Sequence, residues 1–362
     1  MKVIRELARV IVGGLFIFSG LIKLNDPIGT AIKLEEYFQV FAQDIAPFFE
    51  VFEPAALFLA VFLSVLEVVL GVAVLFAYRM TITSITLIFL IVFFTGLTFY
   101  SAYFNKVTDC GCFGDAIKLT PWQSFTKDVI LLALILVIFF SYPKYKAFLS
   151  AKTGNVVMAL VTIGSTVIAL LAIWYLPFID FRNYAVGNNL PEQMIAEENA
   201  RYEYVMEKDG EEFRFDSYPS DPGYTLVEAV LLNPDKVEPK IPDFGVWNDD
   251  GDFTEEILTG TKLLLIIHNT AKANTKKMER IKDLAVASGF DTWILSSSGY
   301  EDTDAFRHAH QLSFPFYFGD ATVLKAMIRS NPGIMLLKDG TVLGKWHYNA
   351  VPNSNELRNL VQ

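Results

Sequence analysis

The sequence predicts a helical membrane bundle followed by a water-exposed α/β domain, and three observations carry this prediction. The 362-residue chain is 52% hydrophobic and only 19% charged, which is too apolar for an ordinary soluble domain. The long apolar runs all lie in the first 177 residues, and from residue 242 strand-like and helix-like segments alternate. Residues 1–177 carry 12 Lys and Arg against 11 Asp and Glu, whereas residues 178–362 carry 18 against 29. The formal net charge of −10 therefore comes from the second half.

Five apolar runs are each near the ~20 residues that a helix needs to cross the hydrocarbon core. The first run follows a charged N-terminus, which also fits a signal peptide, but no small-residue cleavage site follows it and we predict a spanning helix. Residues 26–54 mix apolar and charged side chains at helical spacing, which predicts an amphipathic helix in the membrane interface. The predicted spans are residues 7–24, 55–77, 81–104, 124–142 and 156–176.

The Lys and Arg distribution predicts the orientation. With a cytoplasmic N-terminus, the short inside connections hold seven Lys and Arg, and the much longer outside connections hold five. Five spans then place the C-terminal half outside, which in a bacterium means an inner-membrane protein with a periplasmic domain. The bilayer is the expected surrounding of the first half. The acidic second half would repel phosphates, so nucleic acid is not an expected partner.

The expected domain organisation has four parts. Residues 1–150 form a four-span membrane domain, 151–177 a fifth, linking span, 178–240 a β- and loop-rich connector, and 241–362 a soluble α/β domain. In the last of these, Asp339-Gly340 is a typical hairpin turn between two strands. Alternation of strands and helices, closed by a hairpin and a helix, is the pattern of an α/β class. The predicted strands are residues 263–268, 292–296, 314–317, 333–338 and 341–347, and the predicted helices are 275–287, 303–311 and 321–328.

The two cysteines of the chain lie one residue apart, as Cys110-Gly111-Cys112, beyond the third span. A Cys-x-Cys pair can close into a strained disulfide, and strained, exposed disulfides tend to be the oxidising and catalytic ones. We therefore predict a redox dithiol with a Cys110–Cys112 disulfide; two inert, reduced thiols are the alternative. We predict no metal site, because two thiolates need further ligands and no His lies within 150 residues.

Glu67 lies about 12 residues into the second span, where a carboxylate is costly unless it faces the bundle interior. It is a candidate proton carrier or quinone contact, and a structural hydrogen bond to Ser19 or Thr95 is the alternative. Lys23 and Asp26 follow the first span and are candidate cofactor-binding residues. Lys23 would stabilise a thiolate or contact a quinone, whereas a lysine paired with Asp26 is the structural alternative.

Residues 1–150 resemble the MauE/DoxX family of redox-associated membrane proteins. The resemblance is carried by Ser19-Gly20-Leu21-Ile22-Lys23-Leu24-Asn25-Asp26-Pro27, by Glu67, and by Cys110-Gly111-Cys112-Phe113-Gly114. It implies a four-helix membrane module linked to disulfide or quinone redox chemistry, with quinone as the possible cofactor.

Residues 241–362 resemble a thioredoxin-like domain. The resemblance lies in Leu263–His268, the helix after it, and Asn331–Gly340, and it implies a cis Asn331–Pro332 bond. Where that family carries Cys-x-x-Cys, this chain reads Asn269-Thr270-Ala271-Lys272-Ala273-Asn274. The domain therefore cannot carry out thiol exchange itself, and we expect it to position or recognise a partner. His268 beside this segment is expected to be structural.

Two functions follow from these features. The first is thiol–disulfide exchange through Cys110 and Cys112, with Glu67 as a catalytic group, coupled to the quinone pool or to a periplasmic thiol protein. The second is a non-enzymatic membrane scaffold whose acidic domain binds an envelope partner. Whether the protein is an enzyme, a thiol–disulfide/quinone oxidoreductase, depends on which of the two holds.

Overall fold

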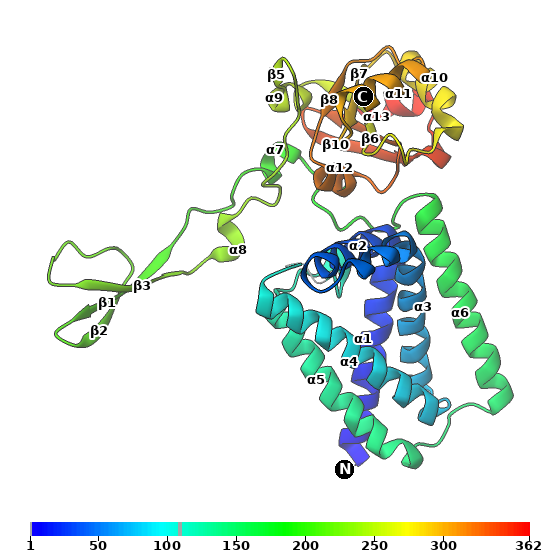
Figure 1. Ribbon diagram of the computed structural model, residues 1–362, viewed down its shortest axis with the longest axis vertical. Coiled ribbons are helices and arrows are strands. Elements are labelled where there is room, and N and C mark those ends of the chain that lie inside the picture. Colours follow the sequence, from blue (N-terminus) through cyan, green and yellow to red (C-terminus); the bar gives the residue numbers. More distant parts are fainter. Residues whose placement is uncertain (1, 108–110) are drawn as a thin grey trace. The chain divides into compact units, whose positions relative to one another are not determined.

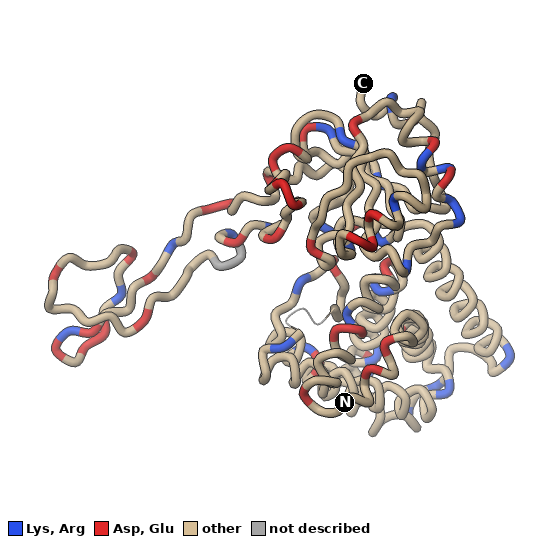
Figure 2. The backbone as a smooth tube through the Cα atoms, turned by 45° about the horizontal axis from the view of Figure 1, so that its top comes forward, with Lys and Arg blue, Asp and Glu red and all other residues tan. Residues whose placement is uncertain are grey.

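The computed structural model describes residues 2–107 and 111–362, except for the side chains of residues 234 and 235. The chain divides into two compact units, Met1–Arg182 and Asn183–Gln362. Cys110 lies outside the described residues, so the predicted Cys110–Cys112 pairing does too. Figure 1 shows the helices of the first unit and the strands of the second, and Figure 2 shows that charged residues are sparse along the long helices.

Within the described residues, the first unit has five helical segments that are long and apolar enough to cross a membrane. The predicted helical membrane class is confirmed. Each observed segment begins before the predicted span, and the predicted spans 55–77 and 156–176 end two residues beyond the observed segments. The helices of this unit are α1 (Lys2–Asn25), α2 (Pro27–Asp44), the 3₁₀ segment η1 (Pro47–Ala55), α3 (Ala56–Leu75), α4 (Met80–Phe104), η2 (Gly114–Ala116), α5 (Pro121–Ser141), η3 (Tyr142–Lys144) and α6 (Ala151–Trp174).

Helices α1 and α3 approach so closely that their backbones are in contact, because glycines lie in the contact between them. A Cβ built on Gly20 would lie 2.9 Å from the Ser64 carbonyl oxygen, and one on Gly71 would lie 2.8 Å from that of Gly13. Small residues allow this approach between membrane helices, where packing rather than water exclusion drives association. This close contact between α1 and α3 brings side chains from successive turns of α1 against the middle of α3.

Helix α2 lies across the end of the bundle at which α1 finishes (Figure 1). Its N-terminus is fixed by Asp26, whose side chain accepts a hydrogen bond from the Gly29 N–H at 2.9 Å, and by Pro27 in the first turn. Tyr37 then bonds to Ser101 of α4 at 2.8 Å. The predicted amphipathic segment 26–54 is thus divided into α2 and η1.

The second unit contains a seven-stranded mixed sheet in the order β10-β9-β6-β7-β8-β4-β5. Strands β6, β7 and β8 are parallel, β9 runs antiparallel to β6, and β10 runs antiparallel to β9. The predicted α/β class is confirmed. The strands are β4 (Trp247–Asn248), β5 (Gly251–Asp252), β6 (Thr261–Ile267), β7 (Asp291–Ser296), β8 (Phe316–Phe318), β9 (Gly333–Lys338) and β10 (Thr341–His347). The helices are α9 (Thr254–Ile257), η4 (Thr275–Lys277), α10 (Met278–Ser288), α11 (Tyr300–Ala309), α12 (Ala321–Met327), η5 (Tyr348–Ala350) and α13 (Ser354–Val361).

Strand β6 is the centre of this domain, since Leu263–Ile267 are at most 1% exposed and both faces of the strand are covered. The run is continuously apolar for that reason. The hairpin between β9 and β10 has positive φ at Asp339 (49°) and Gly340 (72°), the turn that an Asp-Gly pair favours. The predicted cis Asn331–Pro332 bond is present.

The segment predicted as a connector has two parts. Its first residues pair with the last strand of the α/β domain: Gly187 donates to the Val342 carbonyl, and Leu190 to that of Gly340. A separate antiparallel sheet, in the order β2-β1-β3, follows. The elements here are α7 (Leu190–Gln193), β1 (Tyr202–Lys208), β2 (Glu211–Phe215), β3 (Thr225–Leu231) and α8 (Pro234–Val237).

Candidate functional site: a polar pocket in the membrane bundle

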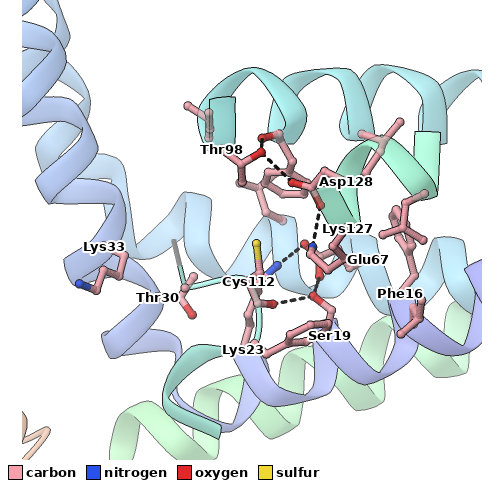
Figure 3. A pocket seen from close by; sticks show the side chains of 18 of the residues that line it. Phe16, Ser19, Lys23, Thr30, Lys33, Glu67, Thr98, Cys112, Lys127 and Asp128 are labelled. Atoms are coloured by element: carbon pink, nitrogen blue, oxygen red, sulfur yellow. Dashed lines mark hydrogen bonds and ion pairs between the residues drawn. The ribbon is translucent and has the colours of Figure 1, made fainter. Parts of the chain in front are cut away.

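A pocket within the membrane bundle brings together polar side chains that are far apart in the sequence (Figure 3). We call it the bundle pocket. It contains about 880 Å³ of empty space, including the solvent in its open mouth. Most of its lining is apolar, with Phe16, Phe94 and Leu131 among the residues. The chemistry comes from the polar remainder, chiefly Ser19, Lys23, Glu67, Cys112, Lys127 and Asp128.

The first polar group is a buried ion pair between α1 and α3. The Lys23 ammonium lies 2.5 Å from Glu67 Oε1, and the two residues are 9% and 2% exposed. Ser19, one turn earlier on α1, donates to Glu67 Oε2 at 2.8 Å. The close glycine packing of α1 on α3 makes these contacts possible. Both carboxylate oxygens therefore have a partner, as a buried carboxylate requires.

A second buried ion pair lies on α5. Lys127 Nζ is 2.6 Å from Asp128 Oδ1, and Asp128 is 1% exposed. Thr98 of α4 donates to the other carboxylate oxygen, Oδ2, at 3.0 Å. The α4–α5 contact thus fixes this aspartate as the α1–α3 contact fixes Glu67.

Cys112 lies against both pairs. Its carbonyl oxygen lies 2.9 Å from Ser19 Oγ, so the single hydroxyl proton is shared between this carbonyl and Glu67 Oε2. Cys112 and Lys127 line the same pocket. The following Phe113 contacts α1 through Phe18, with ring centroids 5.5 Å apart.

The backbone of this segment turns back on itself through two glycines. Gly111 and Gly114 have φ of +62° and +50°, and the Gly114 N–H donates to the Gly111 carbonyl at 3.1 Å. Residues with a Cβ rarely adopt such angles, so the glycines allow the chain to place Cys112 in the pocket rather than pass over it.

Three of the sequence-predicted site residues therefore meet in one place: Glu67, Lys23 and Cys112. Cys110 is outside the described residues. Asp26 caps α2 through Gly29 and is not among the described residues that line the pocket. Lys23 is bonded to Glu67, and Ser19, one of the two hydroxyls proposed as a partner of Glu67, is that partner.

The sequence analysis missed Lys127 and Asp128. A signal was present, because two adjacent charged residues interrupt the start of an otherwise apolar helix. Charged residues inside a span usually face the bundle interior and pair with one another. Lys127 was instead counted as a charge of an outside connection.

The α/β domain has a different arrangement at the end of β6. Ser297 donates to the His268 carbonyl at 2.5 Å, and the Asn331 side chain donates to the Asn269 carbonyl at 2.7 Å. Burial, together with the positive charges of Lys325, Arg329 and Lys272, lowers the pKa of His268 to about 4. Hydroxyl and amide groups thus occupy the segment where the resemblance places cysteines, and the histidine is neutral at pH 7.

Comparison with known proteins bears on the membrane part. The sequence model of the family described as "Methylamine utilisation protein MauE" matches residues 1–141. The chain is also 29% identical to "Protein TlpB" of Flavobacterium psychrophilum over 175 residues, which are 46% of this chain and 43% of that protein. The chain thus spans less than half of the length of this curated relative. No solved structure matches. Residues 1–141, the part that matches the MauE family model, include all the residues that line the bundle pocket.

Proposed function

We propose that this multi-pass membrane protein is a thiol–disulfide oxidoreductase of the bacterial inner membrane. Cys110 and Cys112 exchange disulfides with a periplasmic thiol protein, and electrons pass between this dithiol and the quinone pool through the bundle pocket. The observation that carries the proposal is the position of Cys112. It lies in one apolar pocket with two buried carboxylates and two lysines, although these groups come from three helices and a loop.

The pocket residues fit the demands of dithiol oxidation. Forming a disulfide from two thiols removes two electrons and releases two protons. Glu67 lines the same pocket as Cys112, so a carboxylate is close to the cysteine segment and would accept one of these protons. Lys23 is paired with this carboxylate at 2.5 Å.

The same pocket fits a quinone. Its lining combines flat aromatic side chains, Phe16, Phe94 and Phe113, with ammonium groups that can donate hydrogen bonds to ring oxygens. Lys23 and Lys127 would hold the oxygens, and the apolar residues would hold the ring. A bound quinone would supply a membrane-soluble acceptor for two electrons and two protons.

The α/β domain has a recognition role in this proposal. It has the strand order β10-β9-β6-β7-β8 and a cis Asn331–Pro332 bond, but residues 183–362 contain no cysteine. It would bind the thiol partner and leave the exchange to Cys110 and Cys112.

The test is the redox state of Cys110 and Cys112 in intact cells, measured by alkylation with a mass-tagged maleimide before and after mild reductant. We expect a mixture of oxidised and reduced pair, which shifts toward the reduced form when quinone synthesis is blocked. The single variants Cys110→Ser and Cys112→Ser provide the mass standards.

The proposal would be contradicted if the cysteine pair were fully oxidised and its redox state changed neither with mild reductant nor with quinone depletion. It would favour the scaffold, in which the disulfide only holds a loop. In that case the double variant Cys110→Ser/Cys112→Ser would retain the function of the wild-type protein.

A further inference from the structure

Resting on the proposed function, we propose that Lys127, held in place by Asp128, keeps Cys112 in the thiolate form and so makes it the reactive sulfur of the bundle pocket. Lys127 acts through Cys112 and is a positioning residue. The thiolate is the attacking species in disulfide exchange, so a group that stabilises it sets the rate at neutral pH.

The geometry of α5 supports this role. The Lys127 ammonium contacts Asp128 at 2.6 Å and lies 5.3 Å from the centroid of the Phe113 ring, and Lys127 lines the same pocket as Cys112. An ammonium has three N–H donors, so it can bond to the carboxylate and the sulfur together. The aromatic face adds a cation–π contact. These contacts restrict the flexible lysine side chain to the side of the pocket that carries Cys112.

Asp128 fixes the lysine rather than the cysteine. It is fully buried, and Thr98 occupies its second oxygen. The Thr98 bond therefore leaves Oδ1 to receive Lys127, which orients the ammonium. The aspartate also partly offsets the positive charge that acts on the sulfur, so it tempers the effect of the lysine.

The other charges that face Cys112 are accounted for element by element. Helix α1 contributes Lys23 and α3 contributes Glu67, and these two neutralise each other. Helix α2 contributes Lys33, which is paired with Glu36 at 3.2 Å. The lining residues from α4 are uncharged. In its own segment, Asp109 and Asp115 lie close in sequence and oppose a thiolate. Lys127 is thus a cation that its contacts with Asp128 and Phe113 hold beside the cysteine segment.

The experiment measures the alkylation rate of Cys112 against pH in the full chain, reconstituted in lipid nanodiscs, with iodoacetamide as the probe. The background is Cys110→Ser, which leaves one cysteine. The substitution Lys127→Gln should move the pH profile of the alkylation rate upward by about one unit, which slows alkylation at pH 7 by at most about tenfold. Lys127→Arg keeps the charge and should restore most of the rate.

Asp128→Asn is the matched variant, and it should act in the opposite direction. It removes the negative charge beside Lys127, so the profile should move downward. If Lys127→Gln does not fold because it leaves Asp128 unpaired, the double variant Lys127→Gln/Asp128→Asn removes both charges. Its profile should lie above that of Asp128→Asn alone.

An unchanged profile in Lys127→Gln would overturn the inference, as would a Lys127→Arg variant that behaves like Lys127→Gln. Either result would leave the proposed function intact, because this assay needs neither quinone nor a partner. The redox measurement in intact cells tests that function separately.

Discussion

The membrane part and the α/β domain bury titratable groups in two different ways. In the bundle pocket, Glu67 and Asp128 are each at most 2% exposed and each has a lysine within 2.6 Å. In the α/β domain, burial lowers the pKa of His268 and of His347 to about 4, so both are neutral at pH 7. The first region keeps paired charges inside an apolar bundle, whereas the second holds these two buried histidines neutral.

This difference separates a reactive region from a structural one. Retaining paired charges beside a pocket costs stability compared with apolar packing, so such pairs in a span are commonly associated with function. A neutral histidine in a well-packed core needs only a side-chain shape that fits and a hydrogen-bond partner. His347 illustrates this, because its Nδ1 accepts from the Asn349 N–H at 3.1 Å. The comparison therefore assigns the chemistry to the bundle.

The largest effect is expected when a buried carboxylate of the bundle loses the lysine with which it is paired. Lys23→Met leaves the Glu67 carboxylate buried without its cation, and we expect the free energy of unfolding to fall by about 3–5 kcal/mol. Unfolding of the full chain by SDS titration in mixed micelles measures the loss.

The control for this variant removes both charges. Lys23→Met/Glu67→Leu leaves no unpaired group, and replacing a buried pair with apolar side chains is often neutral. It should therefore be far more stable than Lys23→Met. If the free energy of unfolding fell equally in the single and double variants, the attraction within the ion pair would itself stabilise the bundle. That result would contradict the expectation that the pair costs stability.

A smaller effect is expected from the helix contact that creates the Lys23–Glu67 pair. In Gly20→Ala the new methyl group would lie 2.6 Å from Val68 Cγ2 and 2.9 Å from the Ser64 carbonyl oxygen, so α1 must move away from α3. Overpacking of this kind costs about 1–3 kcal/mol. The same SDS titration measures it.

Gly14→Ala is the matched control, because nothing lies within 4 Å of a Cβ at that position of the same helix. Alanine also has the higher helix propensity, so this variant should be neutral or slightly more stable. If Gly20→Ala and Gly14→Ala have the same stability, the close approach of α1 and α3 does not position the pair.

The spans, the α/β alternation and the hairpin at Asp339-Gly340 could be predicted from the sequence, because each rests on a local pattern of apolar spacing or turn chemistry. Glu67, Lys23 and Cys112 could be singled out one by one, since each is unusual where it stands. Their meeting could not be predicted. It depends on how α1 packs on α3 and on how the segment with Cys112 packs against the bundle. Neither contact can be read from the local spacing of residues in the sequence. Lys127 and Asp128 were missed because an adjacent pair near a helix start looks like a solvated end.

The smallest expected effect concerns the buried histidines of the α/β domain. His268 and His347 have folded pKa values of about 4, below the unfolded value near 6.5, so the unfolded chain takes up protons first as the pH falls. Their contribution is complete above pH 6.5 and is lost on acidification toward pH 4, by about 0.7 kcal/mol per histidine between pH 7 and 6. Hydrogen exchange of the β6 and β10 amides in the full chain, corrected for the intrinsic pH dependence, measures this loss. His347→Gln should remove about half of it, whereas His308→Gln, at a side chain 73% exposed, should leave it unchanged. Equal slopes in all three proteins would show that these histidines are not held neutral by the fold.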